Sequence, residues 1–361
     1  MAERKRIVVA MSGGVDSSTA AALLVQQGHD VIGIGLRLAA PGPETQSHQA
    51  RRGIAAMDDA RRVASQIGIP FHVLDFEAIF EDTVVKYFCR TYLDGKTPNP
   101  CVVCNRAVKF GHLLERARAL GADWVATGHY ARTCRDPDTG RFLLKKAADH
   151  DQDQSYFLYS LSQEQLSRAM FPLADMAKKD TRALARSLGL KVSETPGSQD
   201  ICFIRHGDYR RFLVERFPES LQPGPIVNTR GDVLGEHRGV AHYTTGQRRG
   251  LGIAAESPLY VLAIDVATRR VIVGMRDEAL TRRISVTHVN WIPFDTFEGP
   301  LDLHVKLRYR HPGAPATVSC SEEGGVNLLF STLQTMAAAG QSAVFYDGDV
   351  VVGGGIIGQS R

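Results

Sequence analysis

The stretch Ser12-Gly-Gly-Val-Asp-Ser-Ser18 follows the apolar run Ile7–Met11 and leads into a helical pattern around Ala20. Glycines lack a Cβ and let backbone N–H groups approach a ligand closely, and the start of a helix carries partial positive charge. A strand, a glycine turn and a helix in this order therefore predict a phosphate site over residues 12–18. A plain turn whose serines cap the helix is the alternative.

The spacing of this loop differs from that of two common phosphate-binding loops. It is neither Gly-x-x-x-x-Gly-Lys-Ser/Thr nor Gly-x-Gly-x-x-Gly, and it has no lysine that would reach a γ-phosphate. Transfer of the terminal phosphate is therefore disfavoured. The loop resembles that of the ATP pyrophosphatases, which cleave ATP between its α and β phosphates and leave AMP on a substrate oxygen. This resemblance implies that ATP binds to Ala10, Met11, Ser12, Gly13, Gly14, Val15, Asp16 and Ser17.

Strand and helix patterns alternate over the first 205 residues. Apolar runs at residues 7–11, 31–36, 71–75 and 124–127 are separated by helical patterns. This alternation predicts an α/β domain over residues 1–205, with a parallel sheet and helices on both faces. Ligands of such sheets bind beyond the carboxyl ends of the strands. Leu36, Gly128 and His129 are therefore candidate walls of the nucleotide pocket.

Short strands and Gly/Pro turns follow residue 205. Tyr260–Asp265, Val271–Gly274, Val305–Tyr309 and Ala343–Tyr346 have strand patterns, and Asp347-Gly348-Asp349 forms a turn. We expect a small β-rich domain over residues 206–280 and a terminal β-barrel over 281–361. Pro223-Gly-Pro225 and the stretch 287–300 are plausible boundaries.

Two of the six cysteines lie in contexts that favour reactivity. Cys104 follows the stretch Pro98-Asn-Pro100 and precedes a helical pattern, and Cys202 lies in Ser198-Gln-Asp-Ile-Cys-Phe. The two prolines predict an extended, exposed loop, and Arg106 and Lys109 should bias the Cys104 thiol towards thiolate. No resident metal is expected. A zinc site at Cys101 and Cys104 would need two more ligands, while an iron–sulfur cluster on Cys101, Cys104 and Cys202 remains an alternative.

Length and composition favour an enzyme without a membrane segment. The 361 residues suggest two or three domains, and 43% are hydrophobic. No run approaches 18 apolar residues, and the amino-terminal residues do not resemble a signal peptide, so we expect a cytoplasmic protein. The net charge of +4 is mild and lies entirely within residues 1–205. Basic pairs such as Lys178-Lys179 and Arg248-Arg249 could contact phosphates or be solvated surface.

Seven blocks of sequence, in one order, carry a resemblance that covers the chain from end to end. They are residues 8–18, 97–110, 126–131, 153–158, 198–204, 246–253 and 340–346. Together they are similar to the tRNA-specific 2-thiouridylase family. The resemblance implies sulfur transfer to carbon 2 of the wobble uridine of tRNA. ATP, bound with Mg²⁺, would adenylate the uracil 2-oxygen, so that AMP and pyrophosphate leave. No permanent cofactor is implied.

The same resemblance assigns roles to the two reactive thiols. Cys202 would carry the sulfur as a persulfide, and Cys104 would attack it, freeing the outer sulfur or closing a Cys104–Cys202 disulfide. The persulfide implies a sulfur donor, either a cysteine desulfurase or a relay protein. The tRNA-contacting residues carried over from the family, with the terminal barrel as a further tRNA contact, are Asn99, Pro100, Cys101, His129, Gln152, Asp153, Gln154, Arg308, Tyr309 and Gln341.

Two positions depart from the pattern of the family. Relatives place aspartate where this chain has Cys101, so the proton donor could be Cys101, His129 or a water molecule. Gln152 stands where lysine is common, which removes one expected phosphate contact. Other ATP pyrophosphatases, such as amidating ligases, argininosuccinate synthase or tRNA lysidine synthetase, would share the loop without needing paired thiols. An iron–sulfur-dependent tRNA thiolase and a non-catalytic tRNA-binding protein are further alternatives.

Overall fold

The computed structural model describes residues 3–38, 48–194, 201–204, 207–218, 222–322 and 324–358. Two compact units are present. The first contains residues 1–84, 101–203 and 349–351, and the second contains residues 85–100, 204–348 and 352–361.

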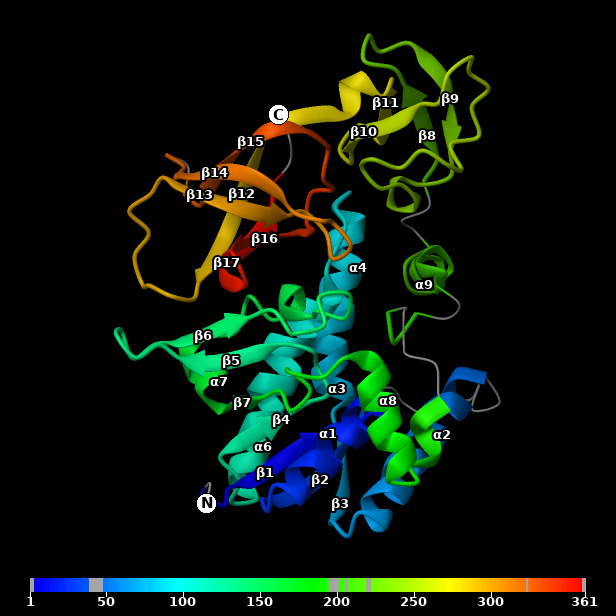
Figure 1. Cartoon of the computed structure of the whole chain (residues 1–361). Coiled ribbons are helices and arrows are strands. Elements are labelled where there is room, and N and C mark those ends of the chain that lie inside the picture. The colour runs from blue at the N-terminus through cyan, green and yellow to red at the C-terminus, as the bar shows by residue number, and fades with distance from the viewer. Residues whose placement is uncertain are drawn as a thin grey trace. The chain divides into compact units, whose positions relative to one another are not determined.

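A five-stranded parallel sheet organises the first unit. Its strands, in the order β3-β2-β1-β4-β7, are Phe71–Asp75, Asp30–Arg37, Arg6–Ala10, Trp124–Ala126 and Ala169–Met170. Ile7 and Val9 of β1 pack with apolar residues of the helices α1, α2 and α8, while Val8 between them faces the opposite side of the sheet. Strands buried on both faces read as continuous apolar runs, which is how β1 could be located in the sequence. The central strands lie side by side in Figure 1.

Helices and a short hairpin complete the first unit. Its helical elements are α1 Val15–Gln26, α2 His48–Gln66, α3 Glu77–Phe80, η1 Glu81–Val85, α5 Pro100–Val103, η2 Cys104–His112, α6 Leu113–Ala119, η3 Ser155–Phe157, α7 Gln163–Arg168, α8 Lys178–Ser187 and η4 Lys191–Glu194. The hairpin strands are β5 Arg132–Arg135 and β6 Phe142–Lys145, and Lys145 pairs with Val350.

The helix that carries Cys104 changes its hydrogen-bonding pattern at that residue. It runs as α-helix over Pro100–Val103, as π-helix over Cys104–His112 and as α-helix again over Leu113–Ala119. A π-helix bonds each residue to the fifth one along, so residues five apart, such as Cys104 and Lys109, come to the same face. Such segments are rare in proteins, and those that do occur often lie at functional sites.

The second unit begins with a helix and a four-stranded sheet. The helical elements are α4 Lys86–Leu93, α9 Tyr209–Arg216, η7 Val240–His242 and η8 Asp277–Ala279. Tyr209 of α9 stacks on Tyr92 of α4 with 4.5 Å between the ring centroids. The sheet has the order β10-β11-β8-β9 and comprises Tyr260–Asp265, Arg270–Gly274, Gly224–Val227 and Val233–His237. This is the small β-rich domain expected from the sequence.

A closed six-stranded barrel forms the rest of the second unit. The strands are β12 Leu280–Trp291, β13 Leu301–Lys306, β14 Ala314–Cys320, β15 Val326–Thr335, β16 Ser342–Asp347 and β17 Val350–Ile357. They follow the order β12-β15-β14-β13-β16-β17, and pairing of β12 with β17 closes the ring. Alternation along the strands fills the interior; for example, Val326, Leu328 and Phe330 are buried and the residues between them are exposed.

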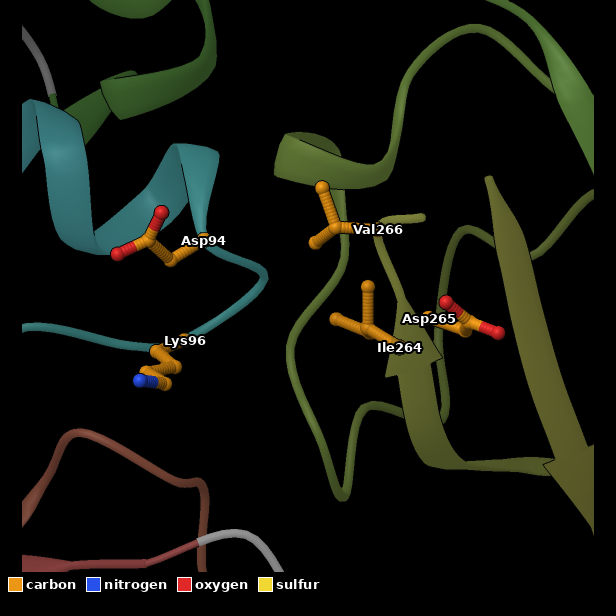
Figure 2. Close-up of a pocket in the computed structure, with 5 residues that line it drawn as sticks. All are labelled: Asp94, Lys96, Ile264, Asp265 and Val266. Carbon is orange, nitrogen blue, oxygen red and sulfur yellow. The ribbon is translucent and has the colours of Figure 1, made fainter. Parts of the chain in front are cut away.

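A turn after α4 packs against the end of β10 in the same unit. Gly95 has φ of +68°, and a Cβ there would lie 2.9 Å from Cγ2 of Val266. Figure 2 shows Ile264 and Val266 pointing towards this turn while Asp265 points away from it, as alternation along a strand requires. The crevice between the turn and the strand is lined by Asp94, Lys96, Ile264, Asp265 and Val266.

The predicted fold class is confirmed, with a parallel α/β domain followed by a small β-rich domain and a β-barrel. Gly224 and Pro225 lie in β8, and Thr287 lies in β12, so neither suggested boundary stretch is simply a linker. The boundaries at residues 205 and 280 stay predictions. In the part of the chain that the structure describes, no helix is long and apolar enough to cross a membrane.

The two glycines of the phosphate loop should differ in their tolerance of a side chain. Gly13 has φ of +76°, and its Cβ would lie 2.1 Å from the carbonyl oxygen of Ala56, whereas Gly14 would meet only the Ser12 hydroxyl at 3.6 Å. We expect Gly13→Ala to lower the free energy of unfolding by about 2 kcal/mol or more. Thermal unfolding without ATP measures this, and Gly14→Ala is the matched control. Equal melting temperatures for the two variants would contradict the loop geometry.

Candidate functional site

The loop after β1 is closed by one serine hydroxyl. Ser17 Oγ accepts a hydrogen bond from the Ser12 amide at 3.1 Å and donates to the Gly14 carbonyl oxygen at 3.2 Å. The Ser12 and Ser17 hydroxyl oxygens are 3.2 Å apart. Helix α1 begins at Val15, and its N-cap residue, Gly14, provides no side-chain cap. The first N–H groups of α1 therefore remain available to an anion at the positive end of the helix.

The carboxylate of Asp16 lies at the centre of a polar network in the first turn of α1. Nζ of Lys178, the first residue of α8, lies 2.6 Å from both carboxylate oxygens. The Tyr130 hydroxyl lies 2.9 Å from Oδ1 of Asp16 and 3.0 Å from the Thr181 hydroxyl. Burial raises the pKa of Tyr130 well above its ordinary value, so the phenol stays protonated. A carboxylate and an ammonium group thus lie together beside the loop, the ammonium group being supplied by α8.

Sequence reasoning did not identify Lys178 as a partner of this loop. The residue lies 162 positions from Asp16, and the sequence signal was only its place in one of several basic pairs. Lys178 and Asp16 come close because α8 and α1 pack together on the same face of the β-sheet.

The loop after β4 approaches the start of α1 at backbone distance. A Cβ at Gly128 would lie 2.5 Å from the Ser17 amide nitrogen, so only glycine fits here. Leu36 lies near the carboxyl end of β2, where it pairs with Leu74 of β3, and it is half-buried. The predicted ATP residues therefore gather at the carboxyl ends of β1, β2 and β4.

Three cysteines of the first unit, Cys101, Cys104 and Cys202, are electrostatically coupled, because Cys104 acts on the other two and Cys101 acts on Cys202. Burial, followed by the neighbouring thiols of Cys104 and Cys101, raises the pKa of Cys202 to about 12. Burial also raises the pKa of Cys104 and of Cys101. Cys104 is buried, while Cys101 and Cys202 keep exposed surface, so protein surrounds these two thiols on most sides without sealing them from solvent.

The sequence-based expectations for this segment were wrong in two respects. Pro98, Asn99 and Pro100 are buried rather than part of an exposed loop, and the helix begins at Pro100. The Cys104 thiol is shifted away from thiolate, because the effect of burial exceeds that of the nearby cation. Ser198–Asp200, just before Cys202, lie outside the described residues.

Lys109 is the cation that acts on all three thiols. Its positive charge opposes the rise in the pKa of Cys101, Cys104 and Cys202. Nζ of Lys109 donates to Oδ1 of Asn105 at 3.0 Å, and Nδ2 of the same Asn105 side chain donates to the Phe157 carbonyl oxygen at 3.0 Å. Asn105 thus fixes the direction of the ammonium group.

His129 belongs to the same neighbourhood. Burial, followed by the charge of Lys109, holds the pKa of His129 well below its ordinary value, so its imidazole is neutral near pH 7. Its Nδ1 lies 2.7 Å from the Thr127 hydroxyl, and the ring packs edge-to-face on Phe171. A neutral imidazole and a protonated Cys101 thiol are both able to donate a proton.

The residues Gln152–Gln154 form a tight loop in the first unit. The Asp153 carboxylate is buried and accepts hydrogen bonds from the Ala147 amide, the Ser155 amide and the Ser155 hydroxyl. Oε1 of Gln154 accepts from the Tyr130 amide at 3.1 Å. Asp153 and Gln154 therefore hold the loop and its neighbour Tyr130, while Gln152 is half-buried.

The other predicted tRNA contacts lie in the second unit. Nε2 of Gln341 donates to the Pro98 carbonyl oxygen at 2.8 Å, and Nδ2 of Asn99 lies 3.3 Å from the Ser342 hydroxyl. These bonds tie residues 97–100 to the barrel within that unit. Arg308 is exposed after β13, and Tyr309 is half-buried. Among the described residues, no group of three or more His, Cys, Asp or Glu side chains is arranged to hold a metal ion.

Family models match three consecutive parts of the chain. A model described as the tRNA methyl transferase HUP domain matches residues 5–206, and one described as the tRNA methyl transferase PRC-barrel domain matches residues 210–275. A third, described as the aminomethyltransferase β-barrel domain, matches residues 281–357.

Curated relatives match over nearly the whole chain. The tRNA-specific 2-thiouridylase MnmA of Acetivibrio thermocellus is 44% identical over 98% of this chain and 99% of its own length. The proteins of the same name from Desulfitobacterium hafniense and Heliobacterium modesticaldum are 46% and 47% identical. These matches cover 99% and 98% of this chain, and 99% and 92% of the respective relatives. The family model over residues 5–206 and these full-length matches show that the chain belongs to the tRNA-specific 2-thiouridylase family.

Proposed function

We propose that this chain catalyses ATP-dependent 2-thiolation of the wobble uridine of tRNA. One observation carries the proposal: a phosphate loop of the ATP pyrophosphatase type and three neighbouring thiols occur in one compact unit. ATP would adenylate the uracil 2-oxygen and release pyrophosphate, so that AMP becomes the leaving group. Sulfur then replaces that oxygen. An amidating ligase of the same loop type would have no use for the thiols.

The ATP site in this proposal is residues 10–17 together with Leu36 and Gly128. The uncapped start of α1 supplies N–H donors for the phosphates. Asp16 would bind Mg²⁺ carried in with ATP, since carboxylate oxygens are ligands that Mg²⁺ prefers. Lys178 would then leave Asp16 for a phosphate oxygen, because both oxygens that it now contacts would face the metal. The position of the Asp16 carboxylate at the phosphate loop supports the binding of Mg²⁺ with ATP. No permanent cofactor is part of the proposal.

Sulfur transfer in this proposal uses Cys202 and Cys104. A sulfur donor, a cysteine desulfurase or a relay protein, would load Cys202 as a persulfide. The outer sulfur attacks carbon 2 of the adenylated uracil, AMP leaves with the former 2-oxygen, and the Cys104 thiolate attacks Sγ of Cys202 to give a disulfide. A thiol reductant then restores both thiols. The effect of Cys104 on the pKa of Cys202 supports the closeness of these two thiols.

Lys109 would stabilise the anionic sulfur species. A buried thiol ionises reluctantly, and a cation held by Asn105 reduces that cost. The proton that the reaction needs would come from Cys101, whose burial keeps the thiol protonated, from the neutral His129 or from water.

The tRNA contacts remain those carried over from the family. They are Asn99, Pro100, Cys101, His129, Gln152, Asp153, Gln154, Arg308, Tyr309 and Gln341. The bonds of Asp153 and Gln341 favour a role in shaping the backbone around the base rather than direct contact. The target base has to leave its stack to reach the thiols. A tRNA substrate also supports the expected cytoplasmic location.

Replacement of either reactive thiol should abolish thiolation. In Cys104→Ser and Cys202→Ser, 2-thiouridine in digested tRNA should fall below about 1% of wild type, because a hydroxyl can neither carry nor release sulfane sulfur. ATP binding should persist. Cys134→Ser, a free cysteine of the β5–β6 hairpin, is the control and should retain activity. Normal 2-thiouridine from both reactive-site variants would overturn the assignment.

Loss of the charge on Lys109 should make the thiols harder to ionise. Lys109 lowers the pKa of Cys104, so Lys109→Met should raise that pKa and move the pH profile of iodoacetamide labelling to higher pH. Lys109→Arg keeps the charge and should restore the profile. Peptide mapping measures labelling at Cys104, with Cys134 as the internal reference. An unchanged profile, or one moved to lower pH, would contradict this role.

Asp16 and Lys178 should differ in how they affect nucleotide binding. Asp16→Asn should raise the Kd of Mg-ATP by about tenfold or more, with a smaller effect on ATP in EDTA, since only the metal contact is lost. Lys178→Met should weaken both forms, because it removes a phosphate contact. Isothermal titration measures the four Kd values. Equal losses with and without Mg²⁺ in Asp16→Asn would count against the metal role.

A further inference from the structure

A basic surface lies in the small β-rich domain, and the roles proposed above do not use it. Residues 237–255 contain Arg238, Arg248 and Arg249, with two histidines and no Asp or Glu. All three arginines are exposed. Within the described parts of the chain, none of the three has an ion pair or a side-chain hydrogen bond. An arginine pair without carboxylate partners keeps its charge for a ligand.

The loop that carries Arg248 and Arg249 is built on a fixed backbone. Oε1 of Gln247 accepts a hydrogen bond from the Thr244 amide at 3.1 Å, and its Nε2 donates to the Arg249 carbonyl oxygen at 2.9 Å. The Gly246 amide donates to the Val261 carbonyl oxygen, and the Val261 amide donates to the Gln247 carbonyl oxygen. Leu251 is buried in the domain core. The loop therefore holds its backbone against β10 while both arginines project outwards.

Arg210 extends the positive charge next to this loop. Its Nε donates to the His242 carbonyl oxygen at 3.1 Å, which joins α9 to η7 just before the loop. Arg210 and Arg238 both act on His242, and together with burial they lower its pKa, so the imidazole is neutral and adds no charge. Asp208 is the carboxylate that opposes them at His242. Nε2 of His242 is buried and has no hydrogen-bond partner among the described residues.

The composition of this surface favours RNA phosphate over an acidic protein. Protein interfaces place apolar or aromatic side chains at their centre. The large exposed hydrophobic residues of this domain, Val233, Leu234, Val266 and Met275, lie outside residues 237–255. Arginine forks match phosphate oxygens, and phosphate contacts need no apolar centre.

We propose that Arg248 and Arg249, flanked by Arg210 and Arg238, bind phosphate groups of the tRNA backbone. The inference rests on the proposed function only in its choice of tRNA as the RNA. The contacts would add affinity without reading sequence, because phosphates are the same at every nucleotide.

The test measures the Kd of an unmodified tRNA transcript for the full chain at several KCl concentrations between about 50 and 200 mM. Arg248→Ala/Arg249→Ala should raise the Kd by about tenfold at the lowest salt and reduce the slope of log K against log salt by about 1 to 2. Arg248→Lys/Arg249→Lys keeps the charge and should retain most of the slope.

The matched control is Arg61→Ala/Arg62→Ala. These exposed arginines of α2 are paired with Asp58 and Asp59, so their loss should leave the slope unchanged. Equal slopes for wild type and the Arg248/Arg249 alanine variant would overturn the proposal. So would a slope lost to the same extent in the control. Thiolation by the wild-type chain is scored separately, so that failure of the proposed reaction is distinct from failure of this binding surface.

Discussion

The backbone approach between Gly128 and the Ser17 amide is the constraint on which the candidate site depends. No side chain fits between them, so the loop after β4 is held against the start of α1. The two residues that follow Gly128 then face different parts of the site. Tyr130 bonds to Asp16 in the nucleotide loop, and His129 lies within the electrostatic reach of Lys109. Four residues after one strand thus connect the proposed ATP site to the thiols.

Burial and one cation set the chemistry of the thiols together. A fully solvated thiol would ionise more readily but would expose a persulfide to any reductant. Burial protects the Cys104 thiol, while Cys202 keeps exposed surface, and each has a pKa above its ordinary value. Lys109 partly offsets the rise in these pKa values. Lys109 and Cys104 both belong to the π-helical segment Cys104–His112, in which residues five apart come to the same face. Adenylation of the base would allow a less reactive sulfur nucleophile to attack carbon 2, because AMP is a good leaving group.

Local patterns predicted the elements that position the site. The loop over residues 12–18, the buried strands and the gathering of residues at their carboxyl ends follow from periodicity and glycine placement. Long-range effects were not accessible from local sequence. Lys178 contacts Asp16 because α8 and α1 pack on the same face of the sheet. Residues 98–100 are buried, and hydrogen bonds between Asn99 and Ser342 and between Gln341 and Pro98 join them to residues far away in the sequence. The direction of the shift in the pKa of Cys104 depends on burial, which nearby charged residues in the sequence do not reveal.

In the proposed reaction, the uracil 2-oxygen becomes part of AMP. Transcript tRNA labelled with ¹⁸O at O2 of the target uridine, incubated with Mg-ATP and a sulfur source, tests it directly by mass spectrometry of the AMP. Adenylation of the base should place one ¹⁸O atom in the phosphate of each AMP formed together with a 2-thiouridine. Unlabelled AMP accompanying 2-thiouridine would contradict adenylation of the base.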